Sequence, residues 1–216
     1  ETEIILIEYS KYMKKKKYCV IGVMSGTSMD GIDISIIKSD GINNYKHLSS
    51  KYFIYSKSTL HLLSRCNNLF AMNKKNIELL YECEQSVTKD YISALKKFIN
   101  LNRQYKTDLI SIHGQTVFHA PQIKSTIQLC NGEFIKESLN IPVVYDFRQR
   151  DILNGGEGAP LVPIFHRLIS KIKKITLPAY FVNIGGISNI TYIDRRGRFS
   201  AYDTGPGMCL LDQYVK

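Results

Sequence analysis

A glycine- and hydroxyl-rich segment near the start of the chain has the residue types of a phosphate-binding turn. Residues 22–33 have the sequence Gly-Val-Met-Ser-Gly-Thr-Ser-Met-Asp-Gly-Ile-Asp, so that Thr27, Ser28 and Asp30 stand between two glycines. Glycine lets the backbone approach an anion closely, with free N–H groups and hydroxyls as hydrogen-bond donors. A carboxylate in the same turn can hold Mg²⁺ directly or through water. The segment therefore predicts a turn that binds nucleotide phosphates.

The same turn also has a purely structural interpretation, in which Asp30 and Ser28 satisfy backbone N–H groups close by. The spacing matches neither G-x-x-x-x-G-K-[ST] nor G-x-G-x-x-G, two common phosphate-binding fingerprints. The turn alone therefore leaves both interpretations open.

Further polar, glycine-rich segments follow apolar runs downstream. They span residues 111–116, 146–151, 155–161, 183–189 and 203–207. In α/β sheets ligands bind at the carboxyl ends of strands. Each segment alone could be a turn, a surface ion pair or a hydrogen-bonded core histidine. Together they favour a ligand site assembled from several strand ends.

The elements that would position these segments alternate between strands and helices, which implies an α/β fold. Short runs rich in β-branched residues predict strands at 18–23, 32–37, 46–55, 109–113, 127–129, 143–146, 179–184, 189–193 and 200–203. Helices are predicted from Ser58 to about Cys66, from about Asn73 to Leu101, over 133–139, and after the loop at 155–161. A strand–glycine turn–strand unit occurs at the start and again near residue 180, as expected of two related lobes.

The long predicted helix carries an apolar stripe at three- and four-residue spacing, which indicates core packing rather than a cofactor site. Its members are Ile77, Leu80, Tyr81, Glu84, Val87, Tyr91, Leu95 and Phe98. The carboxylate of Glu84 is expected at the edge of the stripe.

The composition is that of a globular protein able to bury a core. The 216 residues are 44% hydrophobic and 22% charged, and no apolar run is long enough to span a bilayer. Five scattered cysteines without a C-x-x-C pair argue against disulfides or zinc and for the reducing cytoplasm. The net charge of +10 is spread along the chain, which favours a solvated basic surface over nucleic-acid binding. Neither a membrane nor a nucleic acid is an expected partner.

The chain has three predicted parts. Residues 1–12 join poorly to the first predicted strand, whereas Met13 begins a polar leader into it, so 1–12 are expected to precede the native start. Residues 13–178 form a first lobe, and 179–216 begin a second.

The polar segments, in this order, resemble the anhydro-N-acetylmuramic acid kinase family of the sugar kinase–Hsp70–actin superfamily. The matching stretches are 22–33, 111–119, 143–165, 183–191 and 202–211. The resemblance implies an actin-like ATPase (ribonuclease H-like) fold, with ATP and an amino sugar between two lobes. Because family members are substantially longer, it also implies that much of the second lobe is missing, and that these residues alone are not active.

The resemblance also implies roles for individual residues. Asp203 matches the aspartate regarded as the general base, and Asp30 lies in the magnesium-phosphate region. The expected ATP-binding residues are Gly26, Thr27, Ser28, Met29, Asp30, Gly31, Ile32 and Asp33 of the first turn, with Asn183, Gly185 and Gly186 downstream. The strand-end chemistry assigns His113, Gln115, Asp146 and Arg148 to the sugar.

The implied reaction opens 1,6-anhydro-N-acetylmuramic acid with water and phosphorylates it to N-acetylmuramic acid 6-phosphate in cell-wall recycling. Two alternatives stay open: a related kinase of another sugar, and an inactive remnant that only binds a ligand or a partner. A homodimer is compatible with each.

Overall fold

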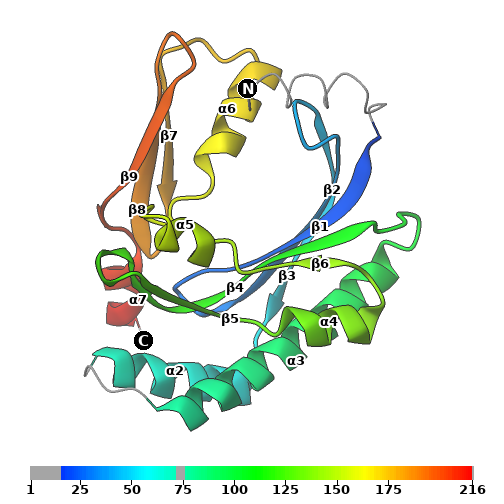
Figure 1. Cartoon of the computed structure of the whole chain (residues 1–216), viewed down its shortest axis with the longest axis vertical. Coiled ribbons are helices and arrows are strands. Elements are labelled where there is room, and N and C mark those ends of the chain that lie inside the picture. The colour runs from blue at the N-terminus through cyan, green and yellow to red at the C-terminus, as the bar shows by residue number, and fades with distance from the viewer. Residues whose placement is uncertain (1–15, 72–75, 216) are drawn as a thin grey trace.

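The first sheet is mixed and contains most of the strands (Figure 1). The computed structural model describes residues 16–71 and 76–215. The strands are β1 (Tyr18–Ser25), β2 (Gly31–Ser39), β3 (Tyr45–Ile54), β4 (Leu109–Ala120), β5 (Ser125–Leu129) and β6 (Val143–Val144). Their order is β3-β2-β1-β4-β5, with β6 also paired to β4. The pairs β1–β4 and β4–β6 are parallel and the others are antiparallel. This arrangement confirms the predicted α/β, actin-like fold.

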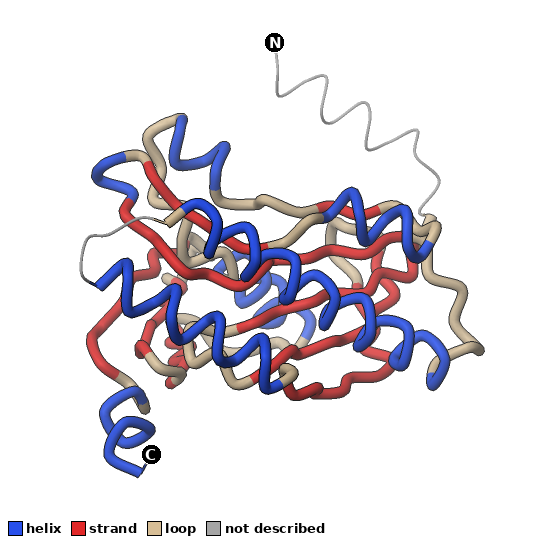
Figure 2. The backbone as a smooth tube through the Cα atoms, turned by 90° about the horizontal axis from the view of Figure 1, so that it is seen from below, coloured by secondary structure: helices blue, strands red, loops and turns tan. Residues whose placement is uncertain are grey.

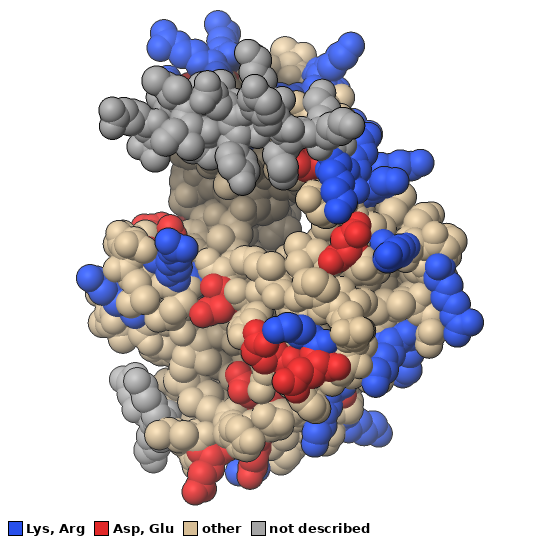
Figure 3. Space-filling view, turned by 45° about the vertical axis from the view of Figure 1, so that its right-hand side comes forward, with Lys and Arg blue, Asp and Glu red and all other residues tan. Residues whose placement is uncertain are grey.

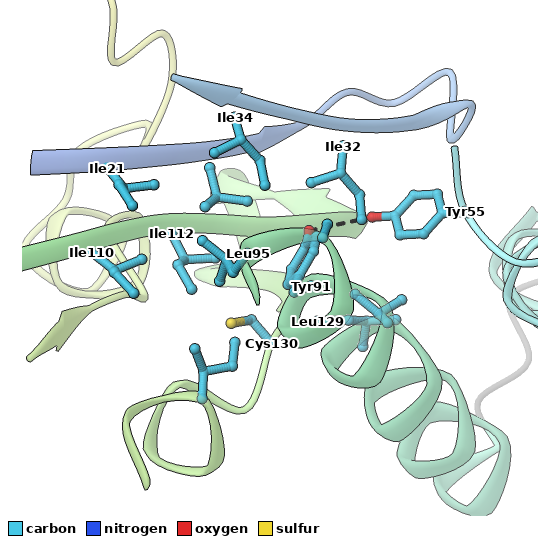
Figure 4. Close-up of a cluster of buried hydrophobic side chains, with 14 of the residues drawn as sticks. Ile21, Ile32, Ile34, Tyr55, Tyr91, Leu95, Ile110, Ile112, Leu129 and Cys130 are labelled. Atoms are coloured by element: carbon cyan, nitrogen blue, oxygen red, sulfur yellow. Dashed lines mark hydrogen bonds between the residues drawn. The ribbon is translucent and has the colours of Figure 1, made fainter. Parts of the chain in front are cut away.

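Two helices cover one face of this sheet, α2 (Lys57–Ala71) and α3 (Ile77–Leu101), and Figure 2 shows them running across the strands. Alternate side chains of β1 and β2 point into this face, so Ile21, Ile32 and Ile34 are fully buried. A third helix, α4 (Gly132–Leu139), leads into β6. Figure 4 shows how Tyr91 and Leu95 of α3 meet the isoleucines of the strands.

The second sheet is a three-stranded antiparallel meander of β7 (Ala179–Ile184), β8 (Ile187–Ile193) and β9 (Phe199–Pro206). Helix α6 (Pro163–Ile172) packs on one face, where the His166 and Phe181 rings stack at 4.6 Å and His166 Nδ1 lies 2.9 Å from Thr191 Oγ1. On the opposite face Tyr180, Val182 and other large side chains are exposed. In Figure 1 this sheet and α6 lie across the first sheet from α2 and α3.

Several element boundaries differ from the sequence prediction. Helix α2 begins earlier and ends later than expected. Ser56 caps it, because Thr59 N–H donates to Ser56 Oγ at 3.2 Å. The predicted start of the next helix near Asn73 lies outside the described residues. Helix α3 begins after Asn76, whose side chain accepts a hydrogen bond from Leu79 N–H.

Strand β4 is the largest departure, because it continues past His113 to Ala120. Its first half pairs with β6 and its second half, from Gln115, pairs with β5. Gly114 lies between the two pairings with φ +84°, where a Cβ would be 3.1 Å from the Gln128 Cβ. Strand β6, in contrast, ends at Val144, two residues before its predicted end at Asp146.

Two short helices were absent from the sequence prediction, α5 (Gln149–Leu153) and α7 (Cys209–Val215). The predicted leader, residues 1–12, lies outside the described residues. Within the part of the chain that the structure describes, no helix is both long and apolar enough to cross a membrane. On the face in Figure 3, lysine and arginine side chains are spread over several areas rather than gathered in one stripe.

Candidate functional site

The turn between β1 and β2 holds the first group of predicted residues. It closes through a 3.2 Å hydrogen bond from Met29 N–H to Gly26 C=O, and Met29 adopts φ +56°. Thr27 and Ser28 are exposed, and Ser28 Oγ donates to Asp30 Oδ1 at 2.9 Å. Gly31 is required sterically, because a Cβ there would lie 2.3 Å from the Phe53 carbonyl oxygen. The turn therefore leaves two hydroxyls and a carboxylate exposed to solvent.

A buried polar network supports this turn from behind. Gln115 Nε2 donates to the Gly26 carbonyl at 2.9 Å, and Gln115 is fully buried. The Tyr55 hydroxyl lies 3.2 Å from Gln115 Oε1 and 2.8 Å from Ser25 Oγ, which also accepts from Tyr91 Oη at 3.0 Å. Burial raises the pKa of Tyr55 to about 12 and that of Tyr91 well above its ordinary value, so both phenols stay neutral. The network joins β1, α3 and β4 behind the turn.

Two carboxylates lie near each other at this turn. Burial raises the pKa of Asp33, and the negative charge of Asp30 raises it further. Among the described residues no three His, Cys, Asp or Glu side chains gather as a metal site. Mg²⁺ bound to a nucleotide needs one or two carboxylates, because phosphates and water supply its other ligands. The oxygen donors of Asp30 and Asp33 fit that requirement.

The second glycine turn, between β7 and β8, lies close to the first. A Cβ on Gly186 would lie 3.4 Å from Thr27 Oγ1. The chain after β9 closes over this turn, because Gly207 N–H donates to Gly186 C=O at 2.9 Å and Met208 N–H to Gly185 C=O at 2.8 Å. At Gly207 a Cβ would meet the Gly185 carbonyl oxygen at 2.2 Å. Glycine turns from both sheets therefore meet at one place.

A histidine–arginine pair lies within electrostatic range of Asp203. Arg148 Nε donates to His113 Nε2 at 3.0 Å, and His113 Nδ1 lies 2.8 Å from the Gly114 carbonyl oxygen. Burial, reinforced by the Arg148 charge, lowers the pKa of His113 to about 4, so the ring is neutral and Nδ1 carries its hydrogen. Burial lowers the pKa values of Arg148 and His119, and the negative charge of Asp203, which is exposed on β9, raises both. Its carboxylate therefore lies near both of these side chains.

A pocket of about 290 Å³ opens where β4 changes its pairing partner. This volume is near the lower end of the range for small-molecule sites, about 300–1,000 Å³. Asp146 lines the pocket, and its backbone has φ +59°, a conformation that aspartate tolerates better than most residues. The lining residues are Glu84, His113, Thr126, Ile127, Gln128, Cys130, Tyr145, Asp146 and Gln149.

Comparison with known proteins shows the family of this chain. The family model for anhydro-N-acetylmuramic acid kinase matches residues 18–216. The chain belongs to the anhydro-N-acetylmuramic acid kinase family.

Curated members of the family are similar along nearly the whole chain. The anhydro-N-acetylmuramic acid kinase of Pelagibacter ubique is 41% identical over 94% of this chain and 55% of its own length. The enzyme of Agrobacterium fabrum is 40% identical over 91% of this chain and 54% of its own length. This chain therefore spans about half the length of the curated relatives that it matches.

The structure brings most of the predicted site residues into two neighbouring groups. The first turn and Gly186 form one, and His113, Arg148 and Asp203 belong to the other. Gln115 lies behind the first turn, with its amide engaged inside the protein. Asn183 is exposed near the end of β7.

Three acidic or basic residues at the site were absent from the predicted set. His119 is near Arg148, Asp203 and Glu157, each of which influences its pKa. Glu157 belongs to the glycine-rich loop at 155–161 that the sequence marked as polar. Glu84 lines the pocket from α3, and the sequence placed it at the edge of the helical stripe without assigning it to the site.

Proposed function

We propose that the protein to which this chain belongs is an ATP-dependent kinase that opens 1,6-anhydro-N-acetylmuramic acid with water and phosphorylates it at O6. The product is N-acetylmuramic acid 6-phosphate, and the role is cell-wall recycling. The observation that carries the proposal is the closeness of the two glycine turns, since a Cβ placed on Gly186 would lie 3.4 Å from Thr27 Oγ1. It places the glycine turns of the two sheets together, and Asp203 follows the second of them along the chain, on β9.

The two turns would hold the nucleotide phosphates. Exposed Thr27 and Ser28 supply hydroxyl donors, and backbone N–H groups around Gly26 and Gly185 add to them. Asp30 and Asp33 would hold Mg²⁺, which neutralises charge on the transferred phosphoryl group. Gln115 fixes the Gly26 carbonyl, so we assign it to positioning of the turn rather than to sugar contact.

Asp203 would act as the general base on a water molecule. The water oxygen forms a bond to C1 of the sugar while its proton passes to Asp203. The C1–O6 bond breaks with its electron pair going to O6, which bonds to the γ-phosphorus as ADP leaves. General-base assistance of this kind contributes about 10²–10⁴-fold. Arg148 lies near Asp203 and is oriented by neutral His113, so it is placed to bind an anionic group of the sugar.

The test is the reaction of the full-length protein with Mg-ATP and 1,6-anhydro-N-acetylmuramic acid in oxygen-18 water. We expect a sugar 6-phosphate with the label at C1. Absence of phosphorylation, or of the label, would overturn the proposal, and phosphorylation of another sugar alone would support the related-kinase alternative. Asp30→Ala should weaken Mg-ATP use much more than sugar binding.

A further inference from the structure

The pocket beside β5 has a chemical character that the proposed reaction does not use. It forms where β4 passes from pairing with β6 to pairing with β5. Its charged lining groups are the carboxylates of Glu84 and Asp146, and no lysine or arginine lines it. An anionic group is therefore disfavoured here.

The charged groups of the pocket, Glu84 and Asp146, are hydrogen-bond acceptors, and Tyr145 and Gln149 also line it with groups that can donate. Gln128 Nε2 donates to Thr126 Oγ1 at 2.7 Å and to Thr116 Oγ1 at 3.4 Å, which leaves the Gln128 carbonyl oxygen as its remaining polar group. Glu84 makes no side-chain hydrogen bond or ion pair with other residues that the structure describes. Carboxylates and an amide carbonyl require donors from a ligand, such as hydroxyl and amide N–H groups.

The pocket also has apolar walls. Ile127 is half-buried and Cys130 is buried, and both line it with the Tyr145 ring. Burial, together with the negative charge of nearby Glu84, raises the pKa of Cys130 to about 12, so the thiol stays neutral. A group that combines an N–H donor with a methyl group would match both the acceptors and these walls.

We propose, on the basis of the function above, that this pocket binds the acetamido group of the amino sugar, and that Glu84 determines specificity by accepting its N–H hydrogen. The methyl group would lie against Ile127 and Cys130. Arg148 does not line the pocket, and its Nη groups remain for the carboxylate of the substrate, because its Nε is bonded to His113. The neutral acetamido group would thus bind in the pocket, and the anionic carboxylate would bind to Arg148.

The test compares two sugars in the full-length protein. The first is 1,6-anhydro-N-acetylmuramic acid, and the second has a hydroxyl in place of the acetamido group. Glu84→Gln should raise the KM for the first sugar about 10-fold, since a hydrogen bond to a charged acceptor becomes a weaker neutral one. The KM for the second sugar, the KM for ATP and kcat should change little. The selectivity between the sugars would fall accordingly.

Two further variants make the test decisive. Glu82→Gln, an exposed position on the same helix, is the matched control and should change neither KM. Ile127→Phe fills the apolar wall without changing charge and should also weaken binding of the acetamido sugar more than that of its analogue. Equal effects on both sugars, or an unchanged selectivity in both pocket variants, would overturn the proposal.

Calorimetric binding separates this inference from the proposed reaction. If the wild-type protein binds the acetamido sugar through Glu84 but does not phosphorylate it, the pocket assignment stands and the reaction is wrong. If it phosphorylates the sugar and neither Glu84→Gln nor Ile127→Phe changes the selectivity, the proposed reaction stands and the pocket assignment is wrong.

Discussion

The two glycine hairpins of this chain are alike in local structure and differ in what supports them. Each joins two antiparallel strands, β1–β2 and β7–β8. Behind the first turn lie a buried hydroxyl network and the α2–α3 layer, whereas the second sheet has α6 on one face and exposed side chains on the other. The first hairpin is therefore a rigid half of a site. The second is held largely by backbone hydrogen bonds at its turn, which Gly207 and Met208 donate to Gly186 and Gly185.

The core packing and the proposed catalytic base are therefore on different sheets. The proposed base, Asp203, is on the less supported sheet, and the proposed magnesium carboxylates are on the better supported one. Changes on the second sheet should therefore affect turnover more than stability, and changes in the first core should do the reverse.

The largest expected effect is on turnover, from Asp203→Asn in the full-length protein. This change keeps the size of the side chain and removes the proton acceptor, so kcat should fall about 10²–10⁴-fold. The melting temperature should barely move, because Asp203 is exposed. Steady-state kinetics and thermal melting on one preparation check both. Retained turnover per folded molecule would leave Asp203 as a turn residue only.

The largest expected effect on stability is in the first core. Leu95→Ala deletes a fully buried side chain of α3 and should cost about 2–5 kcal/mol of unfolding free energy. Leu101→Ala on the same helix is the matched control, because Leu101 is 59% exposed, and it should stay within about 0.5 kcal/mol. Urea denaturation measures both. Similar costs would contradict the assigned core.

The buried histidine of the first sheet predicts a loss of stability in acid. The pKa of His113 is about 4 in the folded protein, below its ordinary value of about 6.5. Above pH 6.5 His113 is neutral in both the folded and the unfolded chain, so the protein has its full stability with respect to this group. As the pH falls towards 4 the unfolded chain binds a proton that the folded one does not, so up to about 3 kcal/mol is lost.

The check on this prediction is the slope of stability against pH rather than stability itself. His113→Asn should flatten the slope between pH 6.5 and 4. Some slope should remain, because burial also lowers the pKa values of His119 and His166. An exposed control, His61→Asn, should leave the slope as in the wild type. An unchanged slope in His113→Asn would contradict a neutral, buried ring.

A smaller effect is expected from the network behind the first turn. Tyr91→Phe removes one buried hydroxyl that donates to Ser25, and should cost about 0.5–1.5 kcal/mol. Tyr81→Phe, at an exposed position of the same helix, should cost almost nothing. The two unfolding midpoints compare them. If Tyr91→Phe leaves the unfolding midpoint unchanged, the network does not support the turn.

The smallest effect is expected on the open face of the second sheet. Val182 is 63% exposed, so Val182→Ser in this chain should change stability by less than about 0.5 kcal/mol. Val23→Ser, at a buried position of β1, should cost several times more. If the two substitutions lower the stability equally, the claim that the first hairpin is better packed than the second is wrong.

Local pattern in the sequence predicted the hairpins well. Alternating or β-branched runs with glycine turns predicted β1, β2, β7 and β8, and β7 has the predicted bounds. Pattern also found the long helix and the later part of its buried face, because Val87, Tyr91, Leu95 and Phe98 of the predicted stripe are buried. At the start of the helix the prediction was wrong: Ile77 and Tyr81 are exposed, whereas Leu79 and Cys83 are buried, and Cys83 lies against Cys66 of α2.

Long-range pairing limited the prediction of the site. The polar residues from His113 to Thr116 resemble a strand end, yet β5 pairs with the second half of β4 and carries the strand onward. Gln115 consequently lies inside the protein. The place of Glu84 at the pocket depends on the same change of partner, which no local pattern contains. The nearness of Asp203 to Arg148 likewise joins residues that only the fold brings together.

The central claim is that both glycine turns form one nucleotide site. Amide hydrogen exchange of the full-length protein, with and without a non-hydrolysable Mg-ATP analogue, tests it most directly. We expect the analogue to slow exchange at residues 26–30 and at Gly185 and Gly186 together, over the same range of concentrations. Protection of one turn without the other, or of neither, would contradict the account.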